Sequence, residues 1–411
     1  MAEPLDRQSI DRETLGNTLP QLLHQRYQQW GDKRVALRQK ELGIWREYTW
    51  KDCYERTKLI ALGLTSLDLK HGDIVGVIAR SSPEWFWCEL GVQAAGGTVL
   101  GVDTAIDAQE MKNVLGQFTV KVVFVQDQEQ VDKVLEMQSA LPSLQQIVYW
   151  RDKGLQHYHD RLLLSLAGLV GMGESYEKSQ PGEFKHRLSE GKETDAAVIL
   201  SGLAVANGEL KSWPATQGFI ISSVRAALAM HPVQAGDEYV SVASPSWFFE
   251  QVLGFGVSLF TGQRLNFAER ADTAAMDFRE ISPQIVMYPS KAWERIAEGI
   301  QSNMEGGSRL KRVLYNLSLS SGRKCTDPAK NGHRIGVLYP ILNRVTSLLF
   351  VRPLRDKHGL NKARVAYAAG GTLPEEPSRM FHALGINVEP VYGSSKDGIV
   401  ASPPPQETRI E

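Results

Sequence analysis

The chain has 411 residues, of which 42% are hydrophobic and 23% are charged, and its 46 basic and 47 acidic residues leave a net charge of -1. This length suffices for about two or three structural units with a large buried core, which excludes a small stapled domain. A net charge near zero provides no overall electrostatic field that would attract nucleic acid, so we expect no nucleic-acid partner.

The cysteines and the apolar runs indicate a cytoplasmic protein. Cys53, Cys88 and Cys325 have no metal-binding spacing, which favours a reducing compartment. The first residues mix both charge signs and contain no apolar h-region, so we expect no signal peptide. The apolar run 162–172 is too short to span a bilayer, and the run 335–351 is interrupted by a proline and polar residues. We therefore expect no transmembrane helix.

Apolar, β-branched runs alternate with amphipathic stretches along the chain, which is typical of βα units around a mainly parallel sheet. The first such strand is expected at 74–79 and is followed by a helix through 85–92. Further strands are predicted at 98–102, 121–125, 147–150, 196–200, 239–242, 264–267, 285–288, 364–367 and 386–391. So many strands with helices between them predict an α/β protein with more than one sheet.

The polar, weakly patterned segment 151–194 is the best internal boundary in the sequence. We expect it to be irregular and to join two subdomains at about 20–150 and 190–400. The glycine-rich segment 306–334 is expected to connect helices at the surface, and the proline-rich tail 401–408 to be mobile.

Several blocks of the sequence resemble the AMP-forming long-chain fatty acyl-CoA synthetases of the adenylate-forming superfamily. These blocks occur in the family's order at 42–50, 82–85, 236–241, 289–294, 350–355 and 381–393. The resemblance implies the family's large N-terminal, AMP-binding domain over 1–411, with stacked βαβ subdomains and mixed, mainly parallel sheets. The family's small C-terminal catalytic domain is expected to be absent from this chain.

The resemblance also implies a reaction. In the family, a fatty acid and ATP form an acyl-adenylate and pyrophosphate, and CoA then yields acyl-CoA and AMP. ATP, Mg²⁺ and CoA are the family's cofactors and substrates. Whether this chain keeps that chemistry depends on three blocks of residues.

The first block is the phosphate-binding loop, which in the family reads T-S-G-T-T-G-x-P-K. Aligned without gaps, this loop corresponds to Leu203-Ala204-Val205-Ala206-Asn207-Gly208-Glu209-Leu210-Lys211. Gly208 and Lys211 match the family, whereas the hydroxyls that would donate to phosphate are lost. Val205 disfavours the positive φ of a tight phosphate nest, and Glu209 adds a negative charge. An alternative register uses Ser201-Gly202 as the family's Ser-Gly, with an insertion, and also predicts a poor ATP site.

The second block is Tyr392-Gly393-Ser394-Ser395-Lys396, which resembles the family's Y-G-x-T-E. Ser395 could supply the hydroxyl of the family's threonine. Lys396 occupies the position of the glutamate that holds Mg²⁺, and an ammonium group cannot ligate a cation. We therefore expect no metal site here and no confident catalytic residue, although Lys396 could neutralise a phosphate directly.

The adenine-side segment 367–373 is closer to the family pattern, and it contains Gly370, Gly371 and Thr372. It could accept a flat ring or could be a simple strand-to-helix turn. With Gly208, Lys211, Tyr392, Gly393 and Ser395, these residues form the expected vestigial nucleotide site.

The third block is 245–251, which in the family lies near the acyl pocket. Trp247, Phe248 and Phe249 could line an apolar tunnel for an alkyl chain, or could form the core of a helix. Separately, the apolar segment 335–350 has basic residues on both sides, so it could rest on an anionic membrane surface or pack on its own domain.

The sequence thus predicts a degenerate homologue of long-chain fatty acid–CoA ligases, inactive alone, that binds an acyl ligand or a partner. One alternative is an active or split ligase that needs a C-terminal domain. Another is a scaffold that binds an active paralogue. The expected location is cytoplasmic, with peripheral attachment to the inner face of a membrane left open.

Overall fold

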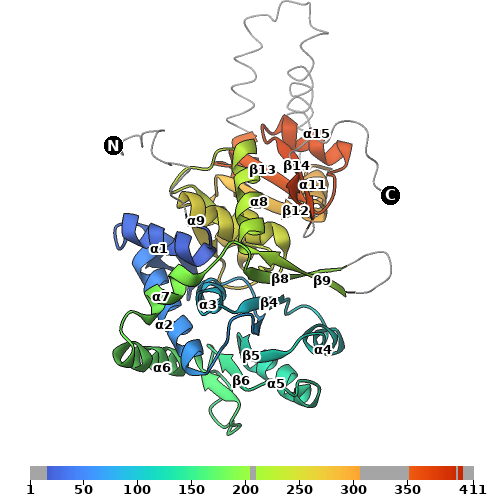
Figure 1. The fold of residues 1–411 in the computed structure, drawn as a ribbon. Coiled ribbons are helices and arrows are strands. Elements are labelled where there is room, and N and C mark those ends of the chain that lie inside the picture. Colours follow the sequence, from blue (N-terminus) through green and yellow to red (C-terminus); the bar gives the residue numbers. More distant parts are fainter. Residues whose placement is uncertain (1–15, 204–209, 306–350, 395–396, 401–411) are drawn as a thin grey trace, which may run out of the picture. The chain divides into compact units, whose positions relative to one another are not determined.

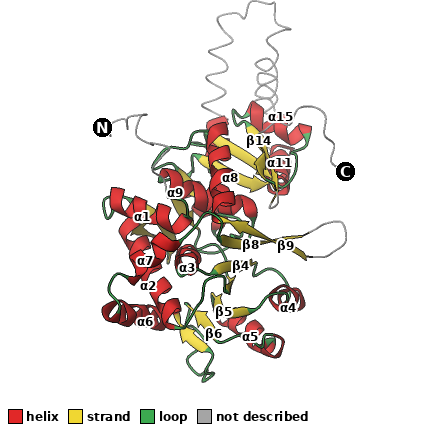
Figure 2. Cartoon of the chain, viewed as in Figure 1, coloured by secondary structure: helices red, strands yellow, loops and turns green. Residues whose placement is uncertain are grey.

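A computed structural model of the chain describes residues 16–203, 210–305, 351–394 and 397–400. These residues form two compact units (Figure 1). Unit 1 takes in the chain up to residue 36, then 47–223 and 244–260, and unit 2 takes in 37–46, 224–243 and the chain from 261 onward. Each unit is built on its own β-sheet (Figure 2).

The sheet of unit 1 has the strand order β7-β6-β5-β3-β4-β8-β9. All neighbouring strands in it are parallel except β8 and β9, which form an antiparallel pair. Its strands are β3 (Ile74–Ile78), β4 (Thr98–Val102), β5 (Val120–Val125), β6 (Gln146–Tyr149), β7 (Leu163–Ser165), β8 (Ala196–Leu203) and β9 (Leu210–Thr216). Its helices are α1 (Leu19–Trp30), α2 (Trp50–Ser66), α3 (Pro83–Ala94), α4 (Ala108–Gly116), α5 (Gln128–Glu136), the 3₁₀ turn Gln138–Ala140, α6 (Leu166–Ser179), α7 (Glu183–Glu190) and the π-helix Glu250–Gly256.

Helices cover both faces of this sheet. Met111 and Leu115 of α4 and Val131 of α5 pack with buried strand residues in one apolar cluster. Helices α2 and α3 lie on the other side of the strands (Figure 1). Helix α6 packs closely on α2, because a Cβ at Gly173 would lie 2.0 Å from the carbonyl oxygen of Leu59. Both faces of the sheet are therefore buried, as expected for parallel strands.

The sheet of unit 2 has the strand order β15-β14-β13-β12-β10-β11-β1-β2. The described pairs from β1 to β14 are parallel, and β14 and β15 are antiparallel. Its strands are β1 (Val35–Glu41), β2 (Ile44–Thr49), β10 (Glu238–Val240), β11 (Arg264–Phe267), β12 (Ile285–Pro289), β13 (Val365–Ala369), β14 (Val388–Ser394) and β15 (Gly398–Val400). Its helices are α10 (Ala274–Ile281), α11 (Ser290–Glu305), α14 (Arg352–Lys357) and α15 (Glu375–Ala383); α8 (Gln217–Met230) and α9 (Val257–Thr261) each begin in unit 1 and end in unit 2.

An aromatic core lies between helices α11 and α15 and the strands of unit 2 (Figure 1). The rings of Trp293 and Phe381 meet edge to face at a centroid distance of 4.9 Å, and both side chains are fully buried. The indole nitrogen of Trp293 donates to the carbonyl oxygen of Tyr367 at 2.9 Å, which ties α11 to β13. This packing fixes the ends of β12, β13 and β14 relative to one another.

The predicted α/β class and its mainly parallel sheets are confirmed, and each predicted strand is present within a few residues of its expected bounds. The structure also contains β1, β2, β7, β9 and β15, for which no strand is predicted. The segment 151–194 is not irregular as expected, because it forms β7, α6 and α7. Gly173 of α6 packs against α2, and the glycines of α6 dilute its apolar pattern, which explains the error. Unit 1 continues through this segment, so it is not where the compact units divide.

Three further expectations, for 306–334, for the apolar segment 335–350 and for 401–408, fall outside the described residues. Among the helices that the structure describes, none has the length and apolarity needed to cross a membrane.

Candidate ligand-binding site

Three parallel strands of unit 2 end at a common edge. The register pairs Pro289 of β12 with Ala369 of β13, and Ala369 with Val391 of β14. Ser290 and Gly370, which follow β12 and β13, and Tyr392, which follows Val391 within β14, therefore lie toward the carboxyl edge of the sheet. Ligands of open α/β sheets bind at this edge, because loops and helix ends converge there.

A glycine turn connects β13 to α15 at this edge. Gly370 and Gly371 have φ values of 71° and 157°, which side-chain-bearing residues rarely adopt. Gly370, Gly371 and Thr372 are exposed. The hydroxyl of Ser290 donates to the carbonyl oxygen of Gly371 at 2.6 Å, which holds the turn against the start of α11. The arrangement is a strand-to-helix turn whose glycines are exposed.

Tyr392 and Gly393 lie in the hairpin of β14 and β15, opposite Val400 and Ile399. Ser395 and Lys396 come between these two strands in the sequence and lie outside the described residues. The exposed carboxylate of Asp397, the next described residue, accepts the hydroxyl of Ser394 at 2.8 Å.

In unit 1, the expected phosphate loop coincides with a β-hairpin. Strand β8 pairs with β9 so that Gly202 lies opposite Lys211 and Leu203 opposite Leu210. Gly208 falls between the two strands, outside the described residues. Ser201 and Gly202 lie within β8, paired with Ser212 and Lys211, and so belong to the strand rather than to its turn.

The aromatic residues of the expected acyl segment differ in exposure. Phe248 and Phe249 are buried, 3% and 4% exposed, and their ring centroids lie 5.4 Å apart. Phe248 also packs on Phe219 of α8, with centroids 5.8 Å apart. Trp247 is partly exposed and meets the ring of Phe249 edge to face. Phe248 and Phe249 are therefore packed as core residues, and Trp247 is the aromatic side chain of this segment that a ligand could reach.

A buried carboxylate lies next to this segment. Glu89 of α3 is 1% exposed, and its Oε2 accepts Nε1 of Trp85 and Nε2 of Gln251, each at 2.8 Å. Gln251 is in the π-helix that follows Phe249, and its Nε2 also donates to the carbonyl oxygen of Pro245 at 2.7 Å. Burial raises the pKa of Glu89 to about 7, against the opposing effect of its N–H donors. π-Helices are uncommon and often lie at functional sites.

Ser290 and Glu89 are residues of the site that the sequence analysis does not predict. Ser290 follows a predicted strand at the edge shared with Gly370, so its position could have been noticed. Glu89 is an ionisable residue within the apolar helix 85–92, and such a residue must be either paired or functional. Its partner Gln251 is 162 residues away in the chain, so the pair itself could not be predicted.

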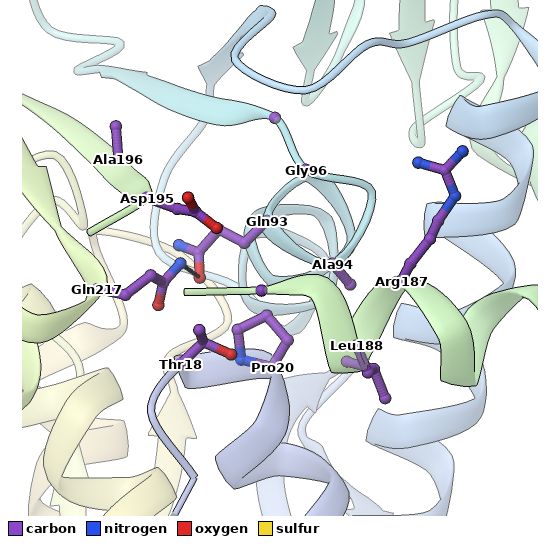
Figure 3. Close-up of a pocket in the computed structure, with 12 residues that line it drawn as sticks. Thr18, Pro20, Gln93, Ala94, Gly96, Arg187, Leu188, Asp195, Ala196 and Gln217 are labelled. Carbon is purple, nitrogen blue, oxygen red and sulfur yellow. Dashed lines mark hydrogen bonds between the residues drawn. The ribbon is translucent and has the colours of Figure 1, made fainter. Parts of the chain in front are cut away.

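A small cavity in unit 1 lies beside Gln93, Gln217 and Thr18 (Figure 3). Its volume of about 20 Å³ is close to that of one water molecule and excludes an organic ligand. Within the part of the chain that the structure describes, no group of three His, Cys, Asp or Glu side chains has the arrangement of a metal site.

The fold is that of the large domain of adenylate-forming enzymes. It is similar to the A-PCP didomain of a carboxylic acid reductase from Segniliparus rugosus in complex with AMP, with a TM-score of 0.66 and 14% identity over 93% of this chain and 53% of that one. It is also similar to the anthranilate CoA ligase AuaEII in complex with anthranoyl-AMP, with a TM-score of 0.65 and 15% identity over 94% of this chain and 60% of that one.

A family model described as AMP-binding enzyme matches residues 23–410, so the chain belongs to the AMP-binding enzyme family. Curated relatives include the long-chain-fatty-acid–CoA ligase ACSBG2 of Xenopus laevis, 22% identical over 391 residues, and ACSBG1 of Rattus norvegicus, 24% identical over 392 residues. Each match covers 92% of this chain, and 51% and 52% of the relatives respectively. The chain thus spans about half the length of these relatives.

Proposed function

We propose that this chain is a degenerate homologue of long-chain fatty acid–CoA ligases that binds an acyl ligand or a partner and does not ligate fatty acids efficiently by itself. The observation that carries the proposal is the composition of the segment joining β8 to β9. A site for the β- and γ-phosphates of ATP needs hydroxyl and backbone donors on a turn of small residues.

The residues 203–208 of this segment contain no hydroxyl group. Val205 stands where the family has a glycine, and Glu209 would repel a triphosphate. Lys396 stands where the family's metal-binding glutamate is expected, so a second part of the triphosphate site is changed in the same direction.

The residues expected on the adenine side of the site support the proposal that this chain has lost phosphate and metal binding but not the adenine contact. Gly370 and Gly371 keep their positive φ values, and Ser290 holds the turn through the carbonyl oxygen of Gly371. Trp247, partly exposed ahead of the π-helix, supports a retained acyl contact. We therefore propose that the ligand of the segment 245–251 is a fatty acid or another acyl compound.

The decisive experiment restores the family's loop and measures Mg·ATP binding by calorimetry. The restored variant combines Leu203→Thr, Ala204→Ser, Val205→Gly, Ala206→Thr and Asn207→Thr with Lys396→Glu. We expect it to bind at least about tenfold more tightly than the wild type, because several phosphate donors and a metal ligand return. Equal affinities for the two proteins would contradict the proposal.

ATP–pyrophosphate exchange with long-chain fatty acids separates this proposal from the enzyme alternative. We expect no exchange from the chain alone or with an added C-terminal domain of a related ligase. Robust exchange in the second case would identify a split ligase and overturn the proposal.

Acyl binding is tested with a fluorescent fatty acid. Trp247→Ala should weaken binding by roughly tenfold, the effect of losing an aromatic contact in a ligand site. Trp150→Ala is a matched control, because Trp150 is a similarly half-buried tryptophan that follows β6. An absence of fatty-acid binding, with a stable complex between the chain and an active paralogue, would favour the scaffold alternative.

A further inference from the structure

Glu89 is one end of a chain of buried hydrogen bonds within unit 1. The backbone N–H of Leu19 donates to Oε1 of Gln217 at 2.9 Å, and Nε2 of Gln217 donates to Oε1 of Gln93 at 3.1 Å. Nε2 of Gln93 then donates to Oε1 of Glu89 at 3.4 Å. The side chains of Glu89, Gln93 and Gln217 are 1%, 8% and 3% exposed. We refer to Leu19, Gln217, Gln93 and Glu89 as the amide relay; Figure 3 shows its middle link, between Gln217 and Gln93.

Every link of the amide relay runs in the same direction, from donor to acceptor. At one end, the backbone N–H of Leu19 can only donate. At the other end, an ionised Glu89 can only accept. The two glutamine amides between them are therefore held in one orientation by both ends.

The two oxygens of Glu89 are not equivalent. Oε2 already accepts two short hydrogen bonds, from Trp85 and Gln251, whereas the described donor to Oε1 is the more distant amide of Gln93. A proton taken up by the carboxylate is therefore expected on Oε1. There it would face the amide donor of Gln93, and two donors would meet.

Turning the amide of Gln93 removes that conflict, but it gives up the hydrogen bond from Nε2 of Gln93 to the carbonyl oxygen of Ala197, 3.4 Å away, and moves the meeting of two donors to Gln217. Turning Gln217 in the same way would place its Nε2 against the N–H of Leu19, which cannot reverse. The conflict therefore ends at Leu19, the first residue of α1, and at Gln217, the first residue of α8. Gln217 directly follows β9, the second strand of the hairpin that carries the altered phosphate loop.

We propose that Glu89 is a positioning residue whose effect depends on its protonation state. As a carboxylate, Glu89 holds the first residues of α8 and α1 in place through Gln93 and Gln217. Proton uptake breaks this hold, while the contact with Gln251 is kept. Glu89 thus connects the π-helix, through Gln251, with the end of the β8–β9 hairpin, through Gln93 and Gln217. Its significance for ligand binding rests on the proposed function, whereas the relay is a property of the ligand-free chain.

Glu89 is the titratable group among the residues of the amide relay and the described partners of their side chains. Its pKa is raised by burial, and its described partners Trp85, Gln93 and Gln251 are neutral. Burial also raises the pKa of Cys88 in the same helix, which keeps this thiol neutral. Charged groups around the relay bond elsewhere. Asp195 lines the same cavity as Gln93 and Gln217, and its carboxylate accepts the backbone N–H of Lys192 at 2.8 Å and lies 3.6 Å from Nε2 of His71. Arg26 donates to the carbonyls of Leu259 and Phe260, and Arg187 donates to Glu183 and to the carbonyl of Ala95.

Glu250 neighbours Gln251 in the π-helix and is fully buried, but charge from it is not among the causes of the raised pKa of Glu89. The water-sized cavity beside Gln93 and Gln217 offers a polar route by which solvent protons could reach the relay.

The test uses the whole ligand-free chain. Infrared difference spectra should show a protonated carboxyl band that appears as the pH falls through about 7, and this band should be absent from Glu89→Gln. Hydrogen–deuterium exchange of the peptide containing Leu19, corrected for intrinsic rates, should rise roughly fivefold between about pH 8 and about pH 6 in the wild type. In Glu89→Gln, whose amide places a donor toward Gln93, exchange should be high at both pH values.

Glu174→Gln, which removes an exposed carboxylate from α6, is the matched control and should behave as the wild type. If Glu89→Gln does not fold, Gln93→Met cuts the relay at its centre and should abolish the pH response of Leu19 while the infrared band remains. A wild-type exchange rate that does not change with pH, or a response that persists in Gln93→Met, would overturn the inference. Because no ligand is added, neither outcome depends on whether the chain binds acyl groups.

Discussion

The two units bury charge in opposite ways. In unit 2, the ammonium of Lys40 lies 2.9 Å from Oδ1 of Asp277 and 2.6 Å from Oε2 of Glu280, so opposite charges meet. In unit 1, the described partners of buried Glu89 and Arg26 are uncharged amides, carbonyls and an indole. A buried charge without a counter-charge is less stable, and its pKa moves toward the neutral form.

The pKa values follow this difference. Burial raises the pKa of Glu89 to about 7 and lowers that of Arg26 to about 10. The hydrogen bond to Glu280 raises the pKa of Lys40, which favours its charged form. Unit 2 therefore uses its buried charge as a fixed structural pair, whereas unit 1 contains a group that can change its charge near neutral pH.

Removing one partner of the pair in unit 2 should have the largest effect. Lys40→Met leaves the carboxylate of Asp277, 1% exposed, without its cation, and should reduce the free energy of unfolding by about 3–5 kcal/mol. Urea unfolding at neutral pH measures this change. Lys70→Met is the matched control, because Lys70 and Asp68 form an exposed pair that solvent screens, so its loss should be small beside that of Lys40→Met.

The double variant Lys40→Met/Asp277→Asn should recover part of the loss, since it removes both charges. If Lys40→Met is as stable as the wild type, Lys40 does not stabilise the buried charge of Asp277, and the contrast with Glu89 in unit 1 does not hold.

The second prediction concerns pH and Glu89. The pKa of Glu89 is about 7 in the folded chain and 4.5 in the unfolded chain, so between these values the folded state holds a proton that the unfolded state has lost. Stability should therefore fall as the pH rises from about 4.5 to about 7, and should level off above that. At about 1.4 kcal/mol per pKa unit, the change amounts to about 3 kcal/mol.

The measurement is urea unfolding of the wild type and of Glu89→Gln across this pH range. The difference between the two proteins isolates Glu89 from the other carboxylates of the chain. A difference that stays constant with pH would show that Glu89 is not neutralised by burial, and the contrast between the units would fail.

Arg26 provides a third comparison. Its guanidinium donates to the carbonyl oxygens of Leu259 and Phe260 at 2.8 and 2.9 Å, where α9 is about to end. Arg26→Met should cost about 2 kcal/mol, because two buried carbonyls lose their donors. Arg34→Met is the control, since Arg34 stacks on the same Trp30 ring, 5.0 Å from its centroid against 5.1 Å for Arg26.

Equal losses of unfolding free energy in Arg26→Met and Arg34→Met would assign the effect to the ring contact rather than to the buried carbonyls. In that case Arg26 would not be comparable to Glu89.

Local sequence pattern predicted much of the fold. The strands β3, β4, β5 and β12 are mostly apolar, as buried parallel strands should be, and their positions were predicted. Strand β9 was missed because Lys211, Ser212 and Pro214 do not form such a run, and a proline is tolerated there because β9 is an edge strand. The short hairpin strand β15 depends on its pairing with β14 and has little pattern of its own.

The candidate site was only partly predictable. The glycine turn at Gly370 and Gly371 was identified because its residue types are dictated by backbone conformation. The bonds from Ser290 to Gly371 and from Gln251 to Glu89 join residues 81 and 162 positions apart. Such contacts follow from the tertiary packing, and no local spacing in one sequence encodes them.

The smallest predicted effect separates the contribution of burial from the contribution of the type of hydrogen-bond donor. Glu269 resembles Glu89 in that its described partners are uncharged N–H groups, here the backbone amides of Leu42 and Gly43, each at 3.1 Å. It differs because these bonds lie at the exposed tip of the β1–β2 hairpin, where Leu42 is 90% exposed and has a φ of 49°. Glu269→Gln should therefore change the free energy of unfolding by about 1 kcal/mol or less, as measured by urea unfolding at neutral pH. A loss as large as that of Lys40→Met would mean that uncharged donors, and not burial, set the behaviour of both carboxylates.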